Sequence, residues 1–261
     1  MLIRVKAVAR SLVGRFARTE PGRRLLAWLA QADPEHAMTT VAWLAARESS
    51  FATVQRWPES IGGFEDMAFL FSSNRANMGI ASLALDEAAH LFRIVRGPGI
   101  ETIVEIGRFR GGSTFLIAAA MSDRARLYSY DTHGKLGAPD RVDEPLRGAL
   151  SRYGLDSRVE LVVADSTTAE PPPTPCDLVF IDGDHSYAGA RADFQHWRRF
   201  LRPGGHLLFH DAANERPFVS AYEGSVTVAE EITRDDARSF RRVPAPGSLA
   251  HFVRTEEPAG G

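Results

Sequence analysis

The feature that most constrains the fold is an alternation of short apolar runs with amphipathic helical patterns, which begins at residue 100. Such strand–helix alternation predicts a parallel sheet with helices on both faces. One helical pattern places Ala190, Phe194, Trp197 and Leu201 on a single face, at spacings of four, three and four. The predicted strands are 100–106, 126–131, 158–164, 177–182 and 206–211, and the helices between them lie near 113–121, 143–153, 186–201 and 214–234.

The last two apolar runs, 239–243 and 249–254, differ from the others because no helix fits between them. Pro244, Pro246 and Gly247 occupy the short connection. Parallel neighbours need a crossover of a dozen or more residues, so these two runs must form an antiparallel pair. A parallel sheet that ends in an antiparallel hairpin is found in only some α/β folds.

Residues 1–95 have a different pattern and are predicted to be mostly helical. A helix near 85–96 is ended by Gly97-Pro98-Gly99. We therefore divide the chain into an N-terminal helical cap or substrate lid, 1–95, and an α/β domain, 96–261. Within the cap, apolar residues recur every three or four positions in 5–18, 22–31 and 36–47, whereas 57–63 and 72–80 are predicted to be turn or loop.

Charge excludes some classes of partner. The 261 residues carry a net charge of −2, which provides no general attraction for nucleic acid. The first thirty residues are basic, with seven Lys and Arg against Glu20 alone. A solvated helix face is the simplest interpretation, and weak contact with anionic lipid or an acidic partner is the alternative.

Cysteine content and hydropathy indicate the compartment. Cys176 is the only cysteine, so an internal disulfide and a thiolate zinc site are excluded, and a reducing cytoplasm fits. No apolar run approaches the roughly 20 residues of a membrane span, and charges interrupt the N-terminal runs before a signal peptide could form. We expect a cytoplasmic protein, and a homo-oligomer is compatible with these data.

The turn after the first predicted strand is rich in glycine. In an open α/β sheet, ligands bind beyond the carboxyl ends of the strands. Here Gly107 and Gly111 permit a tight turn and close approach of a ligand, and Ser113 is expected to cap the next helix. Phe109 stands where a dinucleotide fingerprint needs glycine, and the loop lacks the lysine of a P-loop. By itself the pattern is also compatible with a simple tight turn.

The second and third strands end in polar groups that suit a nucleoside. Asp131 follows the second strand, and its carboxylate can accept hydrogen bonds from two ribose hydroxyls. Dehydrogenases use the same device, so this residue does not identify the nucleoside. Asp165 and Ser166 end the third strand, where they could meet an adenine edge. The alternative for Asp165 is an ordinary turn residue.

The fourth and fifth strands end in the densest cluster of chemically active residues. Asp182 and His185 follow the fourth, and His210 and Asp211 follow the fifth. If these strands are neighbours, their ends lie about 5 Å apart. Asp182, His210 and Asp211 could then bind one divalent cation, either magnesium, manganese or iron. Alternatively, the two acids only cap helices or pair with arginines.

Five motifs in this order resemble the class I S-adenosylmethionine (SAM) dependent methyltransferases: VEIGRFRGGST, LYSYD, LVVADS, LVFIDGDHSY and LRPGGHLLFHD. The resemblance covers residues 75–254. Within the class, the chain is most similar to metal-dependent O-methyltransferases such as those of catechol and macrolide sugars. The resemblance implies a Rossmann-like, mostly parallel seven-stranded sheet with a C-terminal antiparallel hairpin.

The resemblance also implies a role for each strand end. A divalent metal, with magnesium as the expected ion, would be held at the fourth and fifth strands, although the family has two acids, or an acid and Asn, where this chain has His210-Asp211. The implied roles are the methionine end of SAM for Glu105, Gly107, Gly111 and Ser113, the ribose for Asp131, the adenine for Asp165 and Ser166, and the metal for Asp182, His210 and Asp211.

His185 occupies the position at which the family carries its general base, three residues after Asp182. An imidazole titrates near neutrality and can remove a hydroxyl proton, although a structural histidine at a helix start is the alternative. We therefore predict metal-assisted O-methylation of a small-molecule hydroxyl on a sugar or a phenolic natural product. The alternatives are a non-catalytic SAM-binding module, an NAD-dependent oxidoreductase and a metal-dependent hydroxylase.

Overall fold

The computed structural model describes residues 19–22, 24, 50–71, 79–133, 140–213 and 223–255. They belong to two compact units, Met1–Arg56 with Phe69–Ile80, and Trp57–Ala68 with Ala81–Gly261. In the first unit the described parts include helical residues at 20–22 and 24 and a 3-10 turn, Phe51–Thr53. Most of the predicted cap helices and most of the loop 72–80 lie outside the described residues.

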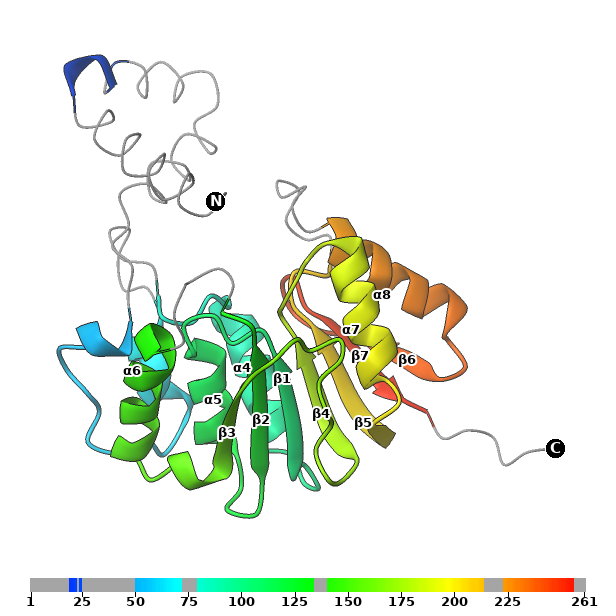
Figure 1. The fold of residues 1–261 in the computed structure, drawn as a ribbon, viewed down its shortest axis with the longest axis horizontal. Helices are drawn as coiled ribbons and strands as arrows, with labels where there is room; N and C mark the ends of the chain where they lie inside the picture. The colour runs from blue at the N-terminus through cyan, green and yellow to red at the C-terminus, as the bar shows by residue number, and fades with distance from the viewer. Residues whose placement is uncertain are drawn as a thin grey trace. The chain divides into compact units, whose positions relative to one another are not determined.

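The second unit is built around one seven-stranded sheet (Figure 1). Its strand order is β3-β2-β1-β4-β5-β7-β6. Strands β1 to β5 pair in parallel, whereas β7 is antiparallel to both β5 and β6. The predicted parallel sheet with a C-terminal antiparallel hairpin is confirmed. The strands are β1 Thr102–Ile106, β2 Arg126–Asp131, β3 Val159–Val163, β4 Cys176–Ile181, β5 Leu201–Phe209, β6 Phe240–Val243 and β7 Ala250–Arg254.

Helices cover both faces of this sheet. The alternation of side chains along β1 sends Val104 and Ile106 into a core shared with Phe194 and Val228 of α7 and α8. Glu105 points to the opposite face, where its carboxylate meets hydroxyl groups of α5. The helices are α4 Leu85–Val95, α5 Gly112–Ala120, α6 Asp140–Arg152, α7 Tyr187–Trp197 and α8 Glu223–Asp235.

The strand order reverses between β1 and β4, which is where open α/β sheets bind ligands. The backbones approach closely at this point, because the Asp182 N–H donates to the carbonyl of Ile106 at 2.8 Å. Gly107, with a φ of 84°, lies beside them, and a Cβ on it would stand 2.3 Å from the carbonyl oxygen of Asp182. Glycine is therefore the residue that this crossing requires.

Two local predictions are wrong. Helix α7 ends at Trp197, and Leu201 begins β5, which starts earlier than the predicted 206–211. Leu201 continues the helical spacing of apolar residues because it is buried in the same core as Ala190, Phe194 and Trp197. It contributes to that core from a strand and not from the helix. Ser113 does not cap α5: the N-cap is Gly111, with a φ of 80° and no side-chain cap, and the Ser113 hydroxyl donates to Glu105.

Candidate active site and metal centre

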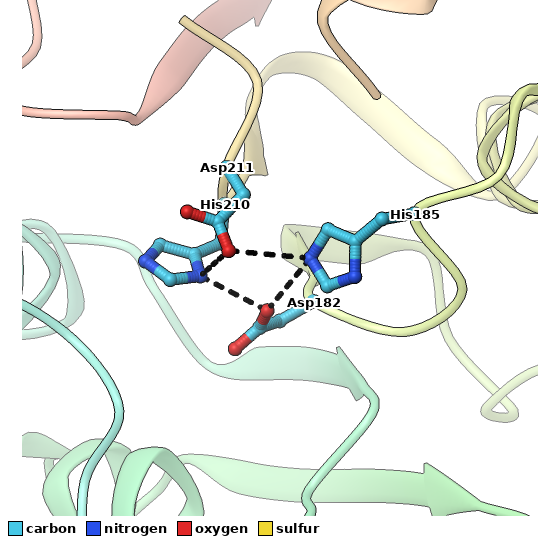
Figure 2. A group of neighbouring side chains, drawn as sticks. All are labelled: Asp182, His185, His210 and Asp211. Atoms are coloured by element: carbon cyan, nitrogen blue, oxygen red, sulfur yellow. Dashed lines mark hydrogen bonds and ion pairs between the residues drawn. The ribbon is translucent and has the colours of Figure 1, made fainter. Parts of the chain in front are cut away.

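Four side chains converge where β4 and β5 end (Figure 2). Asp182 and His185 come from the segment after β4, and His210 and Asp211 directly follow β5. The two strand ends are joined by a hydrogen bond from the His210 N–H to the carbonyl of Ile181, at 3.0 Å. One ligand atom from each of the four side chains lies within 4.8 Å of all the others. The structure thus brings together the three predicted metal ligands and the predicted base.

Two imidazole nitrogens alternate with two carboxylate oxygens around this cluster (Figure 2). His210 Nδ1 lies 3.0 Å from Asp182 Oδ1 and 3.5 Å from Asp211 Oδ2. His185 Nε2 lies 3.4 Å and 3.6 Å from the same two oxygens. A cation with ligand bonds of ~2.1 Å holds neighbouring donor atoms roughly 3.0 to 3.4 Å apart, so the spacing suits a divalent ion.

The cluster combines buried charges of opposite sign. Burial works against ionisation of Asp182, but His210 and His185 outweigh it and lower its pKa to about 2. Burial also disfavours a charged His210, yet Asp182 and Glu87 raise its pKa to about 11. At neutral pH Asp182 is therefore an ionised oxygen donor, as a cation requires.

Glu87 of α4 is a site residue that sequence reasoning missed. Its side chain is fully buried, and Oε2 lies 3.2 Å from His210 Nε2, on the side of the ring away from the cluster. Oε2 also accepts from the Ala84 N–H at 2.7 Å, and Oε1 accepts from the Ser248 N–H at 2.7 Å and its hydroxyl at 2.8 Å. From its sequence neighbours, Glu87 looks like an ordinary acidic residue at the start of a helix. Its contact with His210 could not be predicted locally, because the two residues are 123 positions apart in the chain.

The loop after β5 is held in an unusual backbone conformation. Asp211 has a φ of 52°, a region that non-glycine residues rarely adopt. Ser248 supports this loop: its hydroxyl accepts from the Asp211 N–H at 3.3 Å, and its carbonyl accepts from the N–H groups of Ala212 and Ala213. Such strain persists where surrounding contacts determine it, and it is frequent at functional sites.

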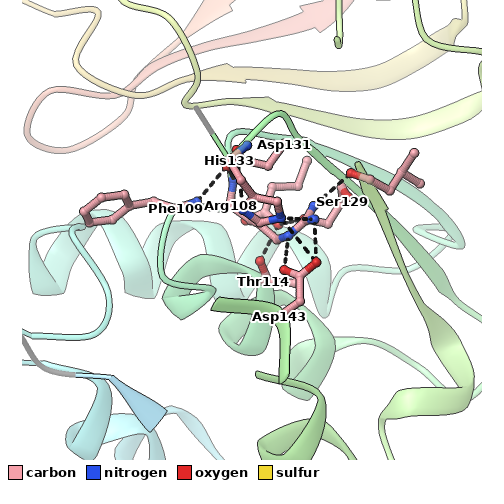
Figure 3. A network of polar contacts seen from close by, with 9 residues as sticks. Arg108, Phe109, Thr114, Ser129, Asp131, His133 and Asp143 are labelled. Carbon is pink, nitrogen blue, oxygen red and sulfur yellow. Dashed lines mark hydrogen bonds and ion pairs between the residues drawn. The ribbon is translucent and has the colours of Figure 1, made fainter. Parts of the chain in front are cut away.

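The predicted ribose acid, Asp131, supports the glycine-rich turn (Figure 3). Its Oδ2 accepts from the N–H groups of Arg108 and Phe109, both at 3.0 Å, and its Oδ1 accepts from the His133 N–H. Phe109 adopts a φ of 47°, so the turn is tight even without a third glycine. A carboxylate offers about four lone-pair sites, and the Asp131 side chain is 16% exposed, so it can accept a further donor.

Arg108 lies beneath this turn as the centre of a buried network (Figure 3). Its guanidinium contacts both oxygens of Asp143 on α6, at 2.8 and 3.0 Å. It also donates to the carbonyls of Ser129 and Val162, and lies 2.9 Å from His133 Nε2. One side chain thereby joins the turn to β2, β3 and α6. Arg108 is not among the site residues that the sequence predicts.

Glu105 is fully buried, with no exposed surface. Its carboxylate accepts hydrogen bonds from the hydroxyls of Ser113, Thr114 and Ser129, at 2.5 to 2.6 Å. Burial raises the pKa of Glu105, and the three hydroxyls oppose that rise. Glu105 therefore ties β1 to α5 and β2, and it reaches the turn only through the hydroxyls that it binds.

The two residues predicted to border an adenine lie at the end of β3. Asp165 is exposed and accepts from the N–H and hydroxyl of Thr167, which is the geometry of a polar turn. The Ser166 hydroxyl donates to Asp193 of α7 at 2.6 Å. Burial raises the pKa of Asp193 to about 6.

Comparison with known proteins places this arrangement in a family context. Residues 104–212 match a family of methyltransferase domains, a segment that begins in β1 and ends just after Asp211. An uncharacterized protein of Acanthamoeba polyphaga mimivirus is 27% identical over 124 residues, 44% of this chain. The chain spans about half the length of that relative, since 53% of it is covered.

Solved structures share the fold at low sequence identity. Cofactor-bound Rv0187 from MTB has a TM-score of 0.56 and 18% identity, covering 91% of this chain and 98% of its own. The O-methyltransferase TomG from Streptomyces achromogenes, in complex with SAM, has a TM-score of 0.54 and 18% identity, with 78% and 93% covered. An O-methyltransferase from Bacillus cereus, in complex with SAH, has a TM-score of 0.50 and 21% identity, with 66% and 83% covered.

These findings confirm the predicted Rossmann-like methyltransferase fold. The seven mostly parallel strands and the terminal antiparallel hairpin are those that the resemblance implied. In the part of the chain that the structure describes, no helix is long and apolar enough to cross a membrane.

Proposed function

We propose that the chain transfers a methyl group from SAM to the hydroxyl oxygen of a small molecule, because residues 104–212 match a family of methyltransferase domains and the fold is shared with a solved cofactor-bound structure. The observation that carries O-methylation is the cluster of two carboxylates and two imidazoles beside the β1 turn. A neutral hydroxyl is a weak nucleophile until its proton is removed. Ionised acids and imidazoles at the rim of the sheet are groups that can promote that loss.

On the donor side, we assign the SAM site to the turn after β1. Gly107, Gly111 and Ser113 would lie along the methionine end, where the backbone can approach a ligand closely. The lone-pair capacity left on Asp131 supports ribose binding, because its present partners are three backbone N–H groups. Asp165 and Ser166 would border the adenine. Glu105, being fully buried, would act from below by orienting Ser113.

On the acceptor side, Asp182, His210 and Asp211 would hold a divalent cation. Their oxygen and nitrogen donors are within bonding reach of one point, which fits such an ion. A bound cation would lower the pKa of the acceptor hydroxyl.

His185 would receive the proton of that hydroxyl at Nε2 as the oxygen–carbon bond forms and the sulfur–carbon bond of SAM breaks. Its side chain is 17% exposed as a whole, whereas Nε2 itself is buried within the cluster. Asp182 and Asp211 face the same nitrogen and would stabilise the charge that it gains. The acceptor is proposed to be a sugar or phenolic natural product. TomG, whose fold this chain shares, is involved in tomaymycin synthesis.

The experiment is a methyl-transfer assay on the full chain with a panel of sugar and phenolic acceptors. S-adenosylhomocysteine and the methylated acceptor are measured together by mass spectrometry, so that both products must appear in equal amounts. Acceptor-dependent formation of both products supports the proposal. Tight SAM binding without product would indicate a binding module, and preferential binding of NAD in calorimetry would indicate an oxidoreductase.

A further inference from the structure

We propose that Glu87 is a positioning residue which holds His210 in one tautomer, and that the resulting nitrogen ligand makes the centre select a borderline transition ion over magnesium. Iron(II), cobalt(II), nickel(II) and zinc are ions of this class. The inference rests on the metal centre of the proposed function and names the class of ion that it binds.

The tautomer follows from the other partners of Glu87. Backbone N–H groups can only donate, and those of Ala84 and Ser248 point to the two carboxylate oxygens. The carboxylate is therefore an acceptor, and the third partner, His210 Nε2, must carry its proton. A bound cation would displace the proton from the other nitrogen, because a ligating imidazole is neutral, and the lone pair on Nδ1 would then face Asp182 and Asp211.

The carboxylate is held rigidly enough to impose this choice. Glu87 is fully buried, and Gly247, with a φ of 60°, approaches so closely that a Cβ would lie 2.3 Å from Glu87 Oε1. Ser248 then binds Glu87 with its N–H and hydroxyl, while the same hydroxyl accepts from the Asp211 N–H. One residue thus fixes both the support of His210 and the backbone of the adjacent ligand.

The expected preference for a transition ion over magnesium comes from the nitrogen donor of His210. Magnesium prefers oxygen ligands and gives up its water reluctantly, whereas imidazole suits transition ions. A His ligand whose far nitrogen donates to a carboxylate is both oriented and made more basic, and loss of such a partner costs about 10- to 100-fold in metal affinity. Glu87 supplies that carboxylate from α4, a different part of the chain from the ligands.

The test measures ion binding by the full chain, freed of metal by chelation, without SAM or acceptor. Cobalt(II) and magnesium are titrated by calorimetry, and the visible spectrum of cobalt reports nitrogen ligation. We expect cobalt to bind at least about 100-fold more tightly than magnesium. Glu87→Gln should weaken cobalt about 10- to 100-fold and change magnesium less than about threefold.

Asp177→Asn is the matched control. Asp177 is also a mostly buried carboxylate that accepts from two backbone N–H groups and one cationic side chain, that of Arg202. It lies at the opposite end of β4 from Asp182. This variant should leave both ion affinities unchanged, which separates loss of a buried acid from loss of the His210 partner.

A second variant removes the nitrogen itself. His210→Asn offers an amide oxygen to the ion and an amide N–H to Glu87, and it should lower the cobalt-to-magnesium ratio at least about tenfold. An unchanged ratio overturns the selectivity argument, because transition ions bind most sites more tightly than magnesium. Equal affinity for both ions in the wild-type chain, or no binding of either, also overturns it.

Unchanged cobalt affinity in a folded Glu87→Gln variant overturns the positioning role. If that variant does not fold, Ser248→Ala removes one hydroxyl donor to Glu87, together with the longer contact at 3.3 Å from the Asp211 N–H. It should weaken cobalt several-fold, and no change would count against the proposal. A chain that methylates but binds magnesium as tightly as cobalt refutes this inference alone. A chain that selects cobalt but methylates no hydroxyl refutes the proposed function alone.

Discussion

Gly107 and Asp182 touch backbone to backbone, so that the turn after β1 and the acid after β4 share one contact. A Cβ on Gly107 would lie 2.3 Å from the Asp182 carbonyl oxygen, and the Asp182 N–H donates to Ile106. The proposed SAM site and the proposed metal centre are therefore parts of one rigid structure. Displacement of either backbone must be transmitted to the other.

The first prediction is that Gly107→Ala damages both halves of the site. The φ of 84° costs a non-glycine residue about 1–2 kcal/mol, and overpacking adds about 1–3 kcal/mol. Urea denaturation should show this loss, with weaker binding of both SAM and metal. Gly148→Ala is the control, because that glycine lies exposed in α6 with no atom near a new Cβ, and it should be neutral or stabilising. A fully stable Gly107→Ala variant would contradict the close contact.

The second prediction concerns His185. Replacement by Gln should lower kcat about 100- to 10,000-fold, the usual effect of losing a general base, and leave SAM affinity nearly unchanged. His196→Gln is the control, because His196 lies on the following helix and binds the carbonyl of Ala169. Product formation by mass spectrometry and SAM titration separate the two effects. Equal turnover in the wild-type and His185→Gln chains would exclude the base assignment.

The third prediction concerns the buried pair of Arg108 and Asp143. Burial alone would raise the pKa of Asp143, but the bonds and charge of Arg108 lower it. Arg108→Ala should cost about 3–5 kcal/mol, because it leaves a buried charge without its partner. The double variant Arg108→Met with Asp143→Leu should recover part of that loss. Urea denaturation of the wild-type chain, Arg108→Met, Asp143→Leu and the double variant gives the coupling, and additive losses would argue against a coupled pair.

The fourth prediction is an acid-sensitive stability. Burial, and then the charges of His206 and His90, lower the pKa of His251 to about 3 from an ordinary 6.5. His251 contacts both rings, at 3.1 Å from His90 and 3.0 Å from His206. The unfolded state therefore takes up a proton first as pH falls, so stability present above pH 6.5 is lost progressively toward pH 3.

The measurement is the free energy of unfolding between pH 7.5 and pH 4.5, taken from urea titrations. In that window His251→Leu should flatten the pH dependence by up to about 1.4 kcal/mol per pH unit, the value of one proton. Above pH 7 the free energies of unfolding of the wild-type and His251→Leu chains should change with pH in the same way. The reason is that the imidazole of His251 is then neutral in both the folded and the unfolded state. Parallel curves at acidic pH would mean that His251 does not carry this dependence.

Much of the candidate site could be predicted because its residues end predicted strands. The carboxyl ends of neighbouring parallel strands meet at one edge of a sheet, so Asp182, His210 and Asp211 had to come close once β4 and β5 were neighbours. The position of Asp165 at a strand end does not indicate that it forms a polar turn with Thr167. The end of a predicted strand shows where in the fold a residue lies, whereas its hydrogen-bond partners determine what the residue does there.

The site residues that the sequence did not predict have charged side chains that are buried. Glu87 lies in a helix that the sequence assigned to the cap, and Arg108 lies between two glycines of a turn. Both would ordinarily be expected at the surface. Each is buried because several partners from distant parts of the chain satisfy its charge.

The sequence by itself determined the strand–helix order, the terminal hairpin and the edge of the sheet where chemistry gathers. These follow from apolar periods and turn residues, which act over a few neighbouring positions. Only the tertiary structure decided that Glu87 supports His210, that Arg108 anchors the turn through Asp143, and that Glu105 is fully buried. The reason is physical: the stability of a buried charge depends on partners far along the chain, and no local pattern encodes their positions.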